Sequence, residues 1–297
     1  MAAKLLDGKD LAARIRQRIA AEVSEFVARS GRAPGLSIVL NADDPSSASF
    51  VRGKDKAARE VGMVCRVHPL PTAVSETELV GLVRGLGDDP TVDGVVVQLP
   101  LPHKVRREGV FEALDPKKDV DGLHPLNQAA LWENRAKLVP CTPAACLRLI
   151  AESGLSLAGA LVVVVGRSAL VGKPTAALLL AADATVTVAH RRTRDLPSLC
   201  RQADALVVAA GQPGLVRGDW VKPGAVVIDV GLSRDSEGKL RGDVDFDSVF
   251  PVAGALTPAP GGVGPMTVAM LLENTLLAAR ERVQCWARGT NADSAKD

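Results

Sequence analysis

Short apolar runs rich in valine recur along the chain, and stretches with helical spacing of apolar residues lie between them. Most of the runs lack polar alternation, which is typical of strands buried on both faces of a sheet. The runs are Leu36–Leu40, Gly94–Gln98, Leu161–Val165, Thr185–Ala189, Ala205–Ala209 and Ala225–Val230. The helical stretches are Asp10–Ala28, Asp55–Val61, Glu76–Gly85, Pro143–Ser153 and Pro174–Ala182. Strands that alternate with helices predict crossover connections and a parallel sheet, so we expect an α/β protein.

The chain length and the distribution of these runs predict two domains. The chain has 297 residues, against a typical domain length of about 150. A proline-rich segment separates the runs before about residue 100 from those after about residue 160. We expect two lobes with a cleft between them, an N-terminal α/β lobe over 1–138 and a Rossmann-like parallel-sheet lobe over 139–267. An apolar helix over 268–287 is expected to pack back on the first lobe, and 288–297 to form a frayed tail.

Charge and hydropathy exclude several classes of partner. Lys and Arg total 36 and Asp and Glu total 34, and no segment gathers the basic residues that binding along a nucleic acid requires. No apolar run reaches the roughly 18 residues of a membrane span. Lys4, Asp7, Lys9 and Asp10 interrupt any secretory signal at the start of the chain. We therefore expect a cytoplasmic protein that binds neither nucleic acid nor membrane.

The cysteines and histidines form no metal-binding pattern. The chain has five cysteines without a CxxC pair and without a histidine at ligand spacing beside them. Asp119, Asp121 and His124 are the best alternative ligand set, but their spacing matches no calcium loop. We expect reduced thiols and no metal site.

The segment from Leu161 to Thr175 predicts a strand, a glycine-containing turn and a helix. The strand ends at Gly166, a second glycine follows at Gly172, and Pro174 stands where the first helical turn tolerates it. Such a turn aims free backbone amides at an anion. A P-loop is disfavoured because the gap between the glycines is too long and Pro174 replaces the hydroxyl residue that holds magnesium. The spacing also departs from GxGxxG, and a purely structural turn is the alternative.

The next predicted strand indicates which dinucleotide would bind. It ends at His190 and is followed by Arg191 and Arg192, where an NAD site usually has an acidic residue for the ribose. Arginines suit a ribose 2′-phosphate, so the sequence favours NADP, although a solvated pair of arginines is the alternative. Two later strands end near Gly211 and Gly231, where glycine admits close approach of a ligand.

In the first lobe, a lysine and a glutamine are candidates for chemistry. Phe50 and Lys54 lie one turn apart on one face of a predicted helix, and Gln98 closes an otherwise apolar strand. A lysine on a helix is usually solvated. Lys54 becomes a candidate acid–base group if a buried amide such as Gln98 meets it, because a desolvated ammonium exchanges protons more readily.

The segment between the lobes is rich in acidic residues. Asp115, Asp119 and Asp121 lie in a predicted loop, where a carboxylate could accept paired N–H donors from a heterocycle. The alternative is a solvated charged loop, and His124 beside Pro125 is as well explained by a structural role.

Six short motifs follow one another along the chain with fitting spacings. They are Phe50-x-x-x-Lys54, Val97-Gln-Leu-Pro-Leu-Pro102, Lys118-Asp-Val-Asp-Gly122, Pro140-Cys-Thr-Pro143, Gly166-Arg-Ser-x-x-Val-Gly172 and Pro260-Gly-Gly-Val-Gly-Pro-Met-Thr267. In this order they resemble the bifunctional methylenetetrahydrofolate dehydrogenase/methenyltetrahydrofolate cyclohydrolase family. The resemblance runs from about Leu6 to Leu277.

The resemblance implies roles for individual residues. The family's essential lysine falls on Lys54, its supporting glutamine on Gln98 and its folate-anchoring aspartate on Asp121. The residues implied to border the folate are Phe50, Pro260, Gly261 and Gly262. Those implied for NADP are Gly166, Arg167, Ser168, Gly172, Arg191, Gly231 and Leu232. The resemblance further implies tetrahydrofolate derivatives as substrates and a homodimer formed through the nucleotide lobe.

The implied chemistry fits these residue types. Hydride loss from the methylene carbon leaves a cation shared by two nitrogens, so that step needs alignment with the nicotinamide and no proton acceptor. The cyclohydrolase step adds water to the cation and opens one C–N bond, which requires proton transfer. We expect Lys54 to perform that transfer.

Four positions depart from the family pattern. Phe50 stands where the family has Tyr, Arg191 where Ser is common, and Ala129 and Ala145 where Gly is usual. Loss of the tyrosine hydroxyl leaves hydride transfer plausible and puts hydrolysis in question. Two alternatives therefore stay open, a dedicated dehydrogenase that releases the methenyl product and a folate- or nucleotide-binding paralogue with little turnover.

Overall fold

The computed structural model describes residues 2–42, 44–71, 73–234 and 238–293, which form two compact units. Unit 1 comprises the residues up to Ala13, Ala130–Arg135 and Pro140–Met270. Unit 2 comprises Arg14–Ala129, Ala136–Val139 and the residues from Leu271 on. Both units are built on parallel sheets, which confirms the predicted α/β class. The cleft expected between the lobes stays a prediction.

Unit 1 contains a six-stranded sheet in the order β1-β11-β8-β7-β5-β6, and all neighbouring strands in it are parallel. Its strands are β1 (Lys4–Leu5), β5 (Leu161–Val165), β6 (Thr185–Ala189), β7 (Ala205–Val208), β8 (Val226–Asp229) and β11 (Ala255–Leu256). The four longest match the predicted runs. The chain passes from β5 to β6 on one side and then crosses to β7 on the other side of β5, so the strand order reverses there, as in dinucleotide-binding folds.

Helices cover both faces of this sheet, and its central strands are therefore buried on both sides. The helices of unit 1 are α6 (Cys141–Ser153), α7 (Gly172–Ala181), α8 (Leu196–Cys200), the 3₁₀ turn η1 (Gly218–Trp220) and α9 (Phe246–Val249). Val163, Leu206 and Val227 face a core that also contains Val216 and Val249. A short antiparallel pair, β9 (Ser233–Arg234) and β10 (Leu240–Arg241), follows β8.

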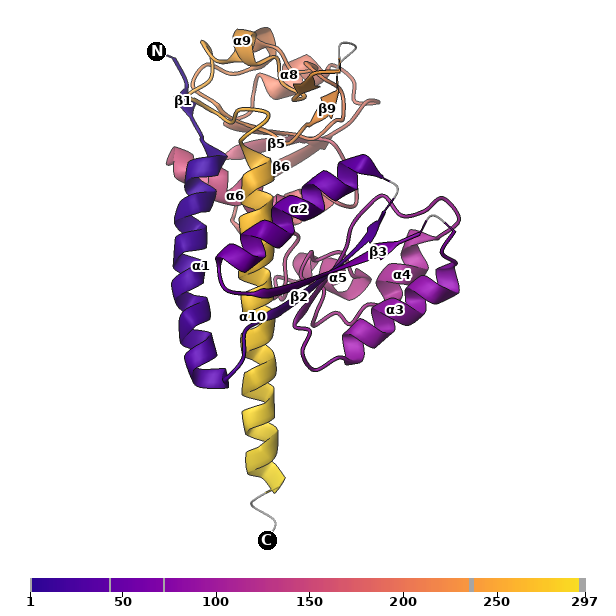
Figure 1. The fold of residues 1–297 in the computed structure, drawn as a ribbon. Helices are drawn as coiled ribbons and strands as arrows, with labels where there is room; N and C mark the ends of the chain where they lie inside the picture. Colours follow the sequence, from indigo (N-terminus) through magenta and orange to yellow (C-terminus); the bar gives the residue numbers. More distant parts are fainter. Residues whose placement is uncertain (1, 43, 72, 235–237, 294–297) are drawn as a thin grey trace. The chain divides into compact units, whose positions relative to one another are not determined.

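Unit 2 contains a three-stranded parallel sheet in the order β3-β2-β4, with β2 (Gly35–Asn41) between β3 (Val64–Leu70) and β4 (Gly94–Val97). Figure 1 shows α2 (Pro45–Glu60) on one side of this sheet and α3 (Glu76–Asp88) with α4 (Arg107–Ala113) on the other. The sequence analysis missed β3. It is an edge strand with exposed residues between its buried ones, so it lacks the continuous apolar run of a central strand.

The first residues of the chain belong to unit 1, and not to the first lobe as the boundary at 138 implied. β1 pairs in parallel with β11, and Leu6 N donates a hydrogen bond of 2.9 Å to Leu256 O. A strand of two residues is too short to be recognised from its apolar pattern.

Two long helices contribute residues to both units. α1 (Gly8–Ser30) and α10 (Val263–Asp293) each cross a unit boundary in sequence. α10 starts at 263 instead of 268 and ends at 293 instead of 287, so the predicted tail is helical up to Asp293. Residues 294–297 of that tail lie outside the described residues.

Within unit 2, charged pairs join α10 to α1 and to the sheet. Arg280 Nη1 lies 2.8 Å from Glu22 Oε2 on α1. Buried Asp93, just before β4, accepts hydrogen bonds from Arg32 at 2.6 and 2.8 Å and from Arg282 at 3.0 Å.

Helix α5 (Pro125–Trp132) completes the set of helices. No helix in the described part of the chain is sufficiently long and apolar to span a membrane. The cysteines whose side chains are described are buried and form no disulfide with one another, and they are Cys65, Cys141, Cys146 and Cys200.

Candidate active site

The carboxyl ends of β2 and β4 lie side by side in unit 2. Gln98, which directly follows β4, donates its backbone N–H to Val39 O at 2.8 Å. The chain passes from β2 to β3 on one side and then crosses to β4 on the other side of β2, and ligands of open parallel sheets bind where the strand order reverses in this way. Helix α2 follows β2 and carries Lys54 toward Gln98.

Lys54 and Gln98 form a direct contact. Lys54 Nζ donates a hydrogen bond of 2.9 Å to Gln98 Oε1. The Gln98 amide nitrogen donates in turn to Leu99 O at 2.9 Å, which holds the amide with its oxygen toward the lysine. Lys54 is only 8% exposed, so it is not the solvated lysine that a helix usually carries. The contact on which the sequence-based hypothesis depended is therefore present.

Phe50 lies one turn before Lys54 on α2, and its side chain is 53% exposed. Ser47, another turn earlier, is buried; its hydroxyl donates to Leu99 O at 3.4 Å and also to the carboxylate of Asp44. The helix therefore places an open aromatic ring beside the buried lysine.

The two aspartates of the Lys118–Gly122 motif have different environments. Asp119 is fully buried, and its Oδ2 accepts hydrogen bonds from His124 N at 2.7 Å and from Asn127 Nδ2 at 2.8 Å. Burial raises the pKa of Asp119, while those donors lower it. Asp121 is partly exposed, and its carboxylate accepts no hydrogen bond from another described residue. Asp119 thus organises the loop, and Asp121 is available to a ligand.

Asp121 lies toward the same end of the sheet as Gln98. A parallel bridge pairs Asp119 with Val95, and Val95 N donates to Lys118 O at 2.7 Å. From that bridge both segments run in the same direction, one to Asp121 and the other to Gln98. Unit 2 therefore brings the three predicted catalytic residues to one edge.

Lys118 and Asn274 hold the segment that carries Asp121. Lys118 Nζ donates to carbonyls at the end of α3, including Asp89 O at 2.8 Å. Burial lowers the pKa of Lys118. Asn274 of α10 donates to Val120 O at 2.9 Å and to Val139 O at 2.8 Å. These bonds fix the backbone on both sides of Asp119, so Asp121 projects from an anchored segment.

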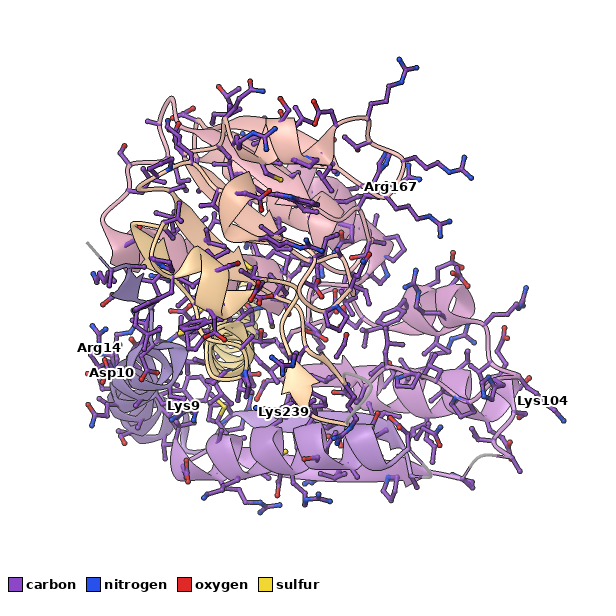
Figure 2. All side chains as sticks on the ribbon, turned by 90° about the horizontal axis from the view of Figure 1, so that it is seen from above. Lys9, Asp10, Arg14, Lys104, Arg167 and Lys239 are labelled. Carbon is purple, nitrogen blue, oxygen red and sulfur yellow. The ribbon has the colours of Figure 1, made fainter. Side chains whose placement is uncertain are left out.

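In unit 1, the turn between β5 and α7 packs tightly on itself and on the residue that follows β7. Gly166 has φ +136°, and a Cβ there would overlap Ala209 O. A Cβ on Gly172 would overlap Gly166 O. Ser168 Oγ accepts a hydrogen bond of 3.1 Å from Val171 N at the start of α7. The exposed side chain of Arg167 extends from this turn at the surface of unit 1 (Figure 2).

The other predicted cofactor residues lie at the same carboxyl edge of the sheet. Arg191 is exposed and follows β6, which pairs with β5. Gly231 follows β8, and Leu232 beside it is 39% exposed. The exposed side chains in this group are those of Arg167, Ser168, Arg191 and Leu232, and they lie at the edge of the sheet where dinucleotides bind.

The Pro260–Gly262 loop belongs to unit 1, whereas the predicted catalytic residues belong to unit 2. Gly262 N donates to Pro258 O at 2.8 Å, and Gly261 has φ +115°. A Cβ on Gly8 would overlap Gly262 O, so the loop packs tightly against the start of α1.

The sequence analysis did not single out several polar residues that shape the site. Asn274 could have been noticed as an amide within an apolar helix, and Asp229 as an acid that closes an apolar strand, as Gln98 does. Ser47 gave no comparable signal. No group of His, Cys, Asp and Glu that could hold a metal ion occurs among the described residues.

Two family models match the chain. The catalytic domain of tetrahydrofolate dehydrogenase/cyclohydrolase matches residues 6–121, and the NAD(P)-binding domain of the same enzyme matches residues 140–283.

Curated proteins and solved structures are similar over most of the chain. The bifunctional protein FolD of Sorangium cellulosum is 56% identical over 95% of this chain and 99% of its own length. That of Acidiphilium cryptum is 52% identical over 95% and 100%. The crystal structure of the Campylobacter jejuni bifunctional enzyme has a TM-score of 0.92 at 42% identity, covering 95% of this chain and 100% of that one. The Trypanosoma brucei dehydrogenase-cyclohydrolase, solved with NADP and an inhibitor, has a TM-score of 0.91 at 41% identity, covering 95% and 99%.

Proposed function

Because this chain belongs to the tetrahydrofolate dehydrogenase/cyclohydrolase family, we propose that it catalyses both reactions of that family. It oxidises 5,10-methylenetetrahydrofolate with NADP and hydrolyses the 5,10-methenyl product to 10-formyltetrahydrofolate. The observation that carries this proposal is the 2.9 Å contact of buried Lys54 with Gln98. A binding protein without turnover would not need a desolvated lysine held by an amide.

We assign the hydrolytic step to Lys54. Water adds to the methenyl carbon and loses one proton. The remaining hydroxyl loses its proton to become the formyl oxygen as the bond from that carbon to one ring nitrogen breaks, and the departing nitrogen gains one proton. The reaction as a whole releases one proton. Lys54 Nζ transfers protons to and from these atoms, and the Gln98 oxygen orients it. Phe50 stacks on the folate.

Asp121 anchors the pterin in this proposal. An ionised carboxylate accepts two hydrogen bonds, which matches the adjacent amino group and ring N–H of a pterin. The available carboxylate of Asp121 on an anchored backbone supports this role. Asp119, whose Oδ2 already accepts bonds from its own loop, is not assigned to the ligand.

The fold of unit 1 suits NADP, which accepts a hydride from the methylene carbon when it is bound. Gly166 and Gly172 let the turn pack closely against Ala209 and against its own backbone, and the exposed residues Arg167 and Ser168 adjoin the start of α7. Arg191 pairs with the 2′-phosphate. Gly231 and Leu232 contact the nicotinamide end. Hydride transfer creates no proton to remove, so these residues act by alignment alone.

Phe50, which stands where the family has Tyr, favours one alternative, a dehydrogenase with weak cyclohydrolase activity. A time course with purified protein, methylenetetrahydrofolate and NADP distinguishes the two functions if NADPH and the methenyl species are followed separately. Formyltetrahydrofolate that appears faster than in buffer, with little methenyl accumulation, supports the bifunctional enzyme. Accumulation of methenyl in step with NADPH supports the alternative, and no NADPH formation refutes both.

We also propose that the chain acts as a cytoplasmic homodimer formed through unit 1, with no nucleic-acid or membrane partner. Sedimentation equilibrium of the 31.0 kDa chain tests the dimer, because a mass that stays monomeric at micromolar concentration contradicts it.

A further inference from the structure

Two buried carboxylates lie at the carboxyl ends of β7 and β8 in unit 1. Asp229, the last residue of β8, is 4% exposed, and Asp243 is fully buried. Neither forms an ion pair with a basic side chain in the described ranges, and neither has a role assigned above. Burying an acid without a cation is costly, so their hydrogen-bond partners indicate what they do.

Asp229 holds the segment that follows β8. Its Oδ1 accepts hydrogen bonds from Gly231 N at 2.9 Å and from Asp243 N at 3.0 Å. Its Oδ2 accepts one from Val244 N at 3.1 Å. The carboxylate therefore bends the chain after β8 and also fixes the backbone of the second acid.

Asp243 holds the segment that follows β7. Its Oδ2 accepts hydrogen bonds from Ala210 N at 2.6 Å and from Gly211 N at 2.8 Å. Its Oδ1 is buried and has no partner among the described residues. The hydrogen bonds that the Asp243 carboxylate accepts thus come from the loop after β7.

The packing around the pair leaves no room for larger neighbours. A Cβ on Gly231 would overlap the Asp243 carboxylate, and one on Gly242 would overlap that of Asp229. Burial raises the pKa of both acids, that of Asp229 to about 7, with a further contribution from the charge of Asp243. The two carboxylates therefore connect the loops after β7 and β8 through backbone N–H donors.

We propose that Asp243, itself held by Asp229, is a positioning residue for hydride transfer. Asp243 fixes the loop after β7 relative to the loop after β8. Gly231 and Leu232, which lie in the loop after β8, contact the nicotinamide end of NADP. This inference rests on the proposed function, because it requires that NADP binds at this edge.

Replacement of Asp243 by Asn tests the proposal, since it keeps the shape of the side chain and removes its charge. NADPH formation and the hydrolysis of added methenyltetrahydrofolate are measured on the same preparation. We expect the KM for NADP to rise on the order of tenfold and kcat for NADPH formation to fall, because charge-assisted bonds to Ala210 and Gly211 weaken. Hydrolysis should change less than twofold. Asp243→Ser, which is smaller and admits a water, serves if the Asn variant does not fold.

The matched control is Asp204→Asn. Asp204 lies at the opposite edge of the same sheet, where it accepts a hydrogen bond of 2.9 Å from Leu161 N. The Asp204→Asn variant should have the same KM for NADP as the wild-type protein. Equal loss of both activities in the Asp243 variants, or an unchanged KM for NADP, would overturn the positioning role. A wild-type protein that forms no NADPH would instead refute the proposed function.

Discussion

Asn274 of α10 holds the main chain next to Asp121: its amide donates to Val120 O at 2.9 Å and, with the other hydrogen, to Val139 O at 2.8 Å. One buried side chain thus joins two segments of unit 2 that are far apart in sequence. This junction helps to fix the backbone that carries Asp121, together with the hydrogen bonds of Lys118 and Asp119.

Asn274→Ala should therefore affect both stability and folate binding. It leaves two buried carbonyls without their donor, at a cost of about 1–3 kcal/mol in the free energy of unfolding. The KM for methylenetetrahydrofolate should rise while the KM for NADP stays unchanged. Urea denaturation and steady-state kinetics measure the two effects, and equal changes in both KM values would contradict the assignment.

Lys54→Met should lower the rate of methenyl hydrolysis about a hundredfold or more, because general acid–base catalysis contributes on this scale. Met keeps the apolar stem, so the variant should still unfold cooperatively. The control is Lys56→Met on the same helix, whose side chain is 79% exposed. Unchanged hydrolysis in the Lys54 variant would remove this residue from the mechanism.

Phe50→Tyr should increase the rate of methenyl hydrolysis. The new hydroxyl lies one helical turn from Lys54 and adds a hydrogen-bonding partner at the lysine. Stability should change by less than about 0.5 kcal/mol, since the ring is 53% exposed. The hydrolysis rate of added methenyltetrahydrofolate is the measurement, and a rate equal to that of wild type would show that the hydroxyl is dispensable here.

Arg191→Ser should raise the KM for NADP on the order of tenfold and leave the KM for NAD nearly unchanged, because only NADP carries the 2′-phosphate. Arg201→Ser provides the control, since Arg201 is exposed in the same unit and donates to Asp219 O at 3.3 Å. If both cofactors lose affinity equally, Arg191 does not meet the 2′-phosphate.

The pH dependence of stability should reflect Asp229. Its pKa is raised by burial from 3.8 to about 7, so the folded protein binds more protons than the unfolded chain between these values. The contribution of Asp229 is complete below the unfolded pKa and is lost as the pH rises through about 7, with a slope of at most about 1.4 kcal/mol per pH unit. Denaturation between pH 5 and pH 8 should give a flatter curve for Asp229→Asn, whatever its absolute stability. Parallel curves would refute this expectation.

Much of the fold could be predicted because its central strands are buried on both faces. β5 and β7 read as uninterrupted apolar runs, and the structure has them at nearly the predicted bounds. β3 could not be predicted in this way, since Arg66 and Pro69 interrupt its pattern at the sheet edge. β1 depends on a pairing with β11, more than 200 residues away, which local sequence does not encode.

The candidate site shows a similar division. Lys54 and Gln98 could be proposed because both stand in motifs of the family that the sequence resembles and because Gln98 closes an otherwise apolar strand, and the structure brings the two side chains into contact. The hydrogen bonds of Asn274, and those between Asp229 and Asp243, could not be predicted from the sequence. These contacts join segments whose paths depend on the tertiary structure. Sequence patterns identify polar residues at strand ends more readily than the backbone groups they bind.

The motif Lys118-Asp-Val-Asp-Gly122 contains two charged residues that hold the loop and a third that is available to a ligand. Lys118 and Asp119 use their charges within the protein, one on the end of α3 and one on its own loop, while Asp121 remains for a ligand. A substitution of Asp121 can therefore change what the loop binds without changing the path of its backbone. Under the role proposed for Asp121, a relative that kept the first two charges and lost the third would retain the shape of the loop and lose the anchor for the pterin, so the last aspartate of the motif is the one that reports on the substrate.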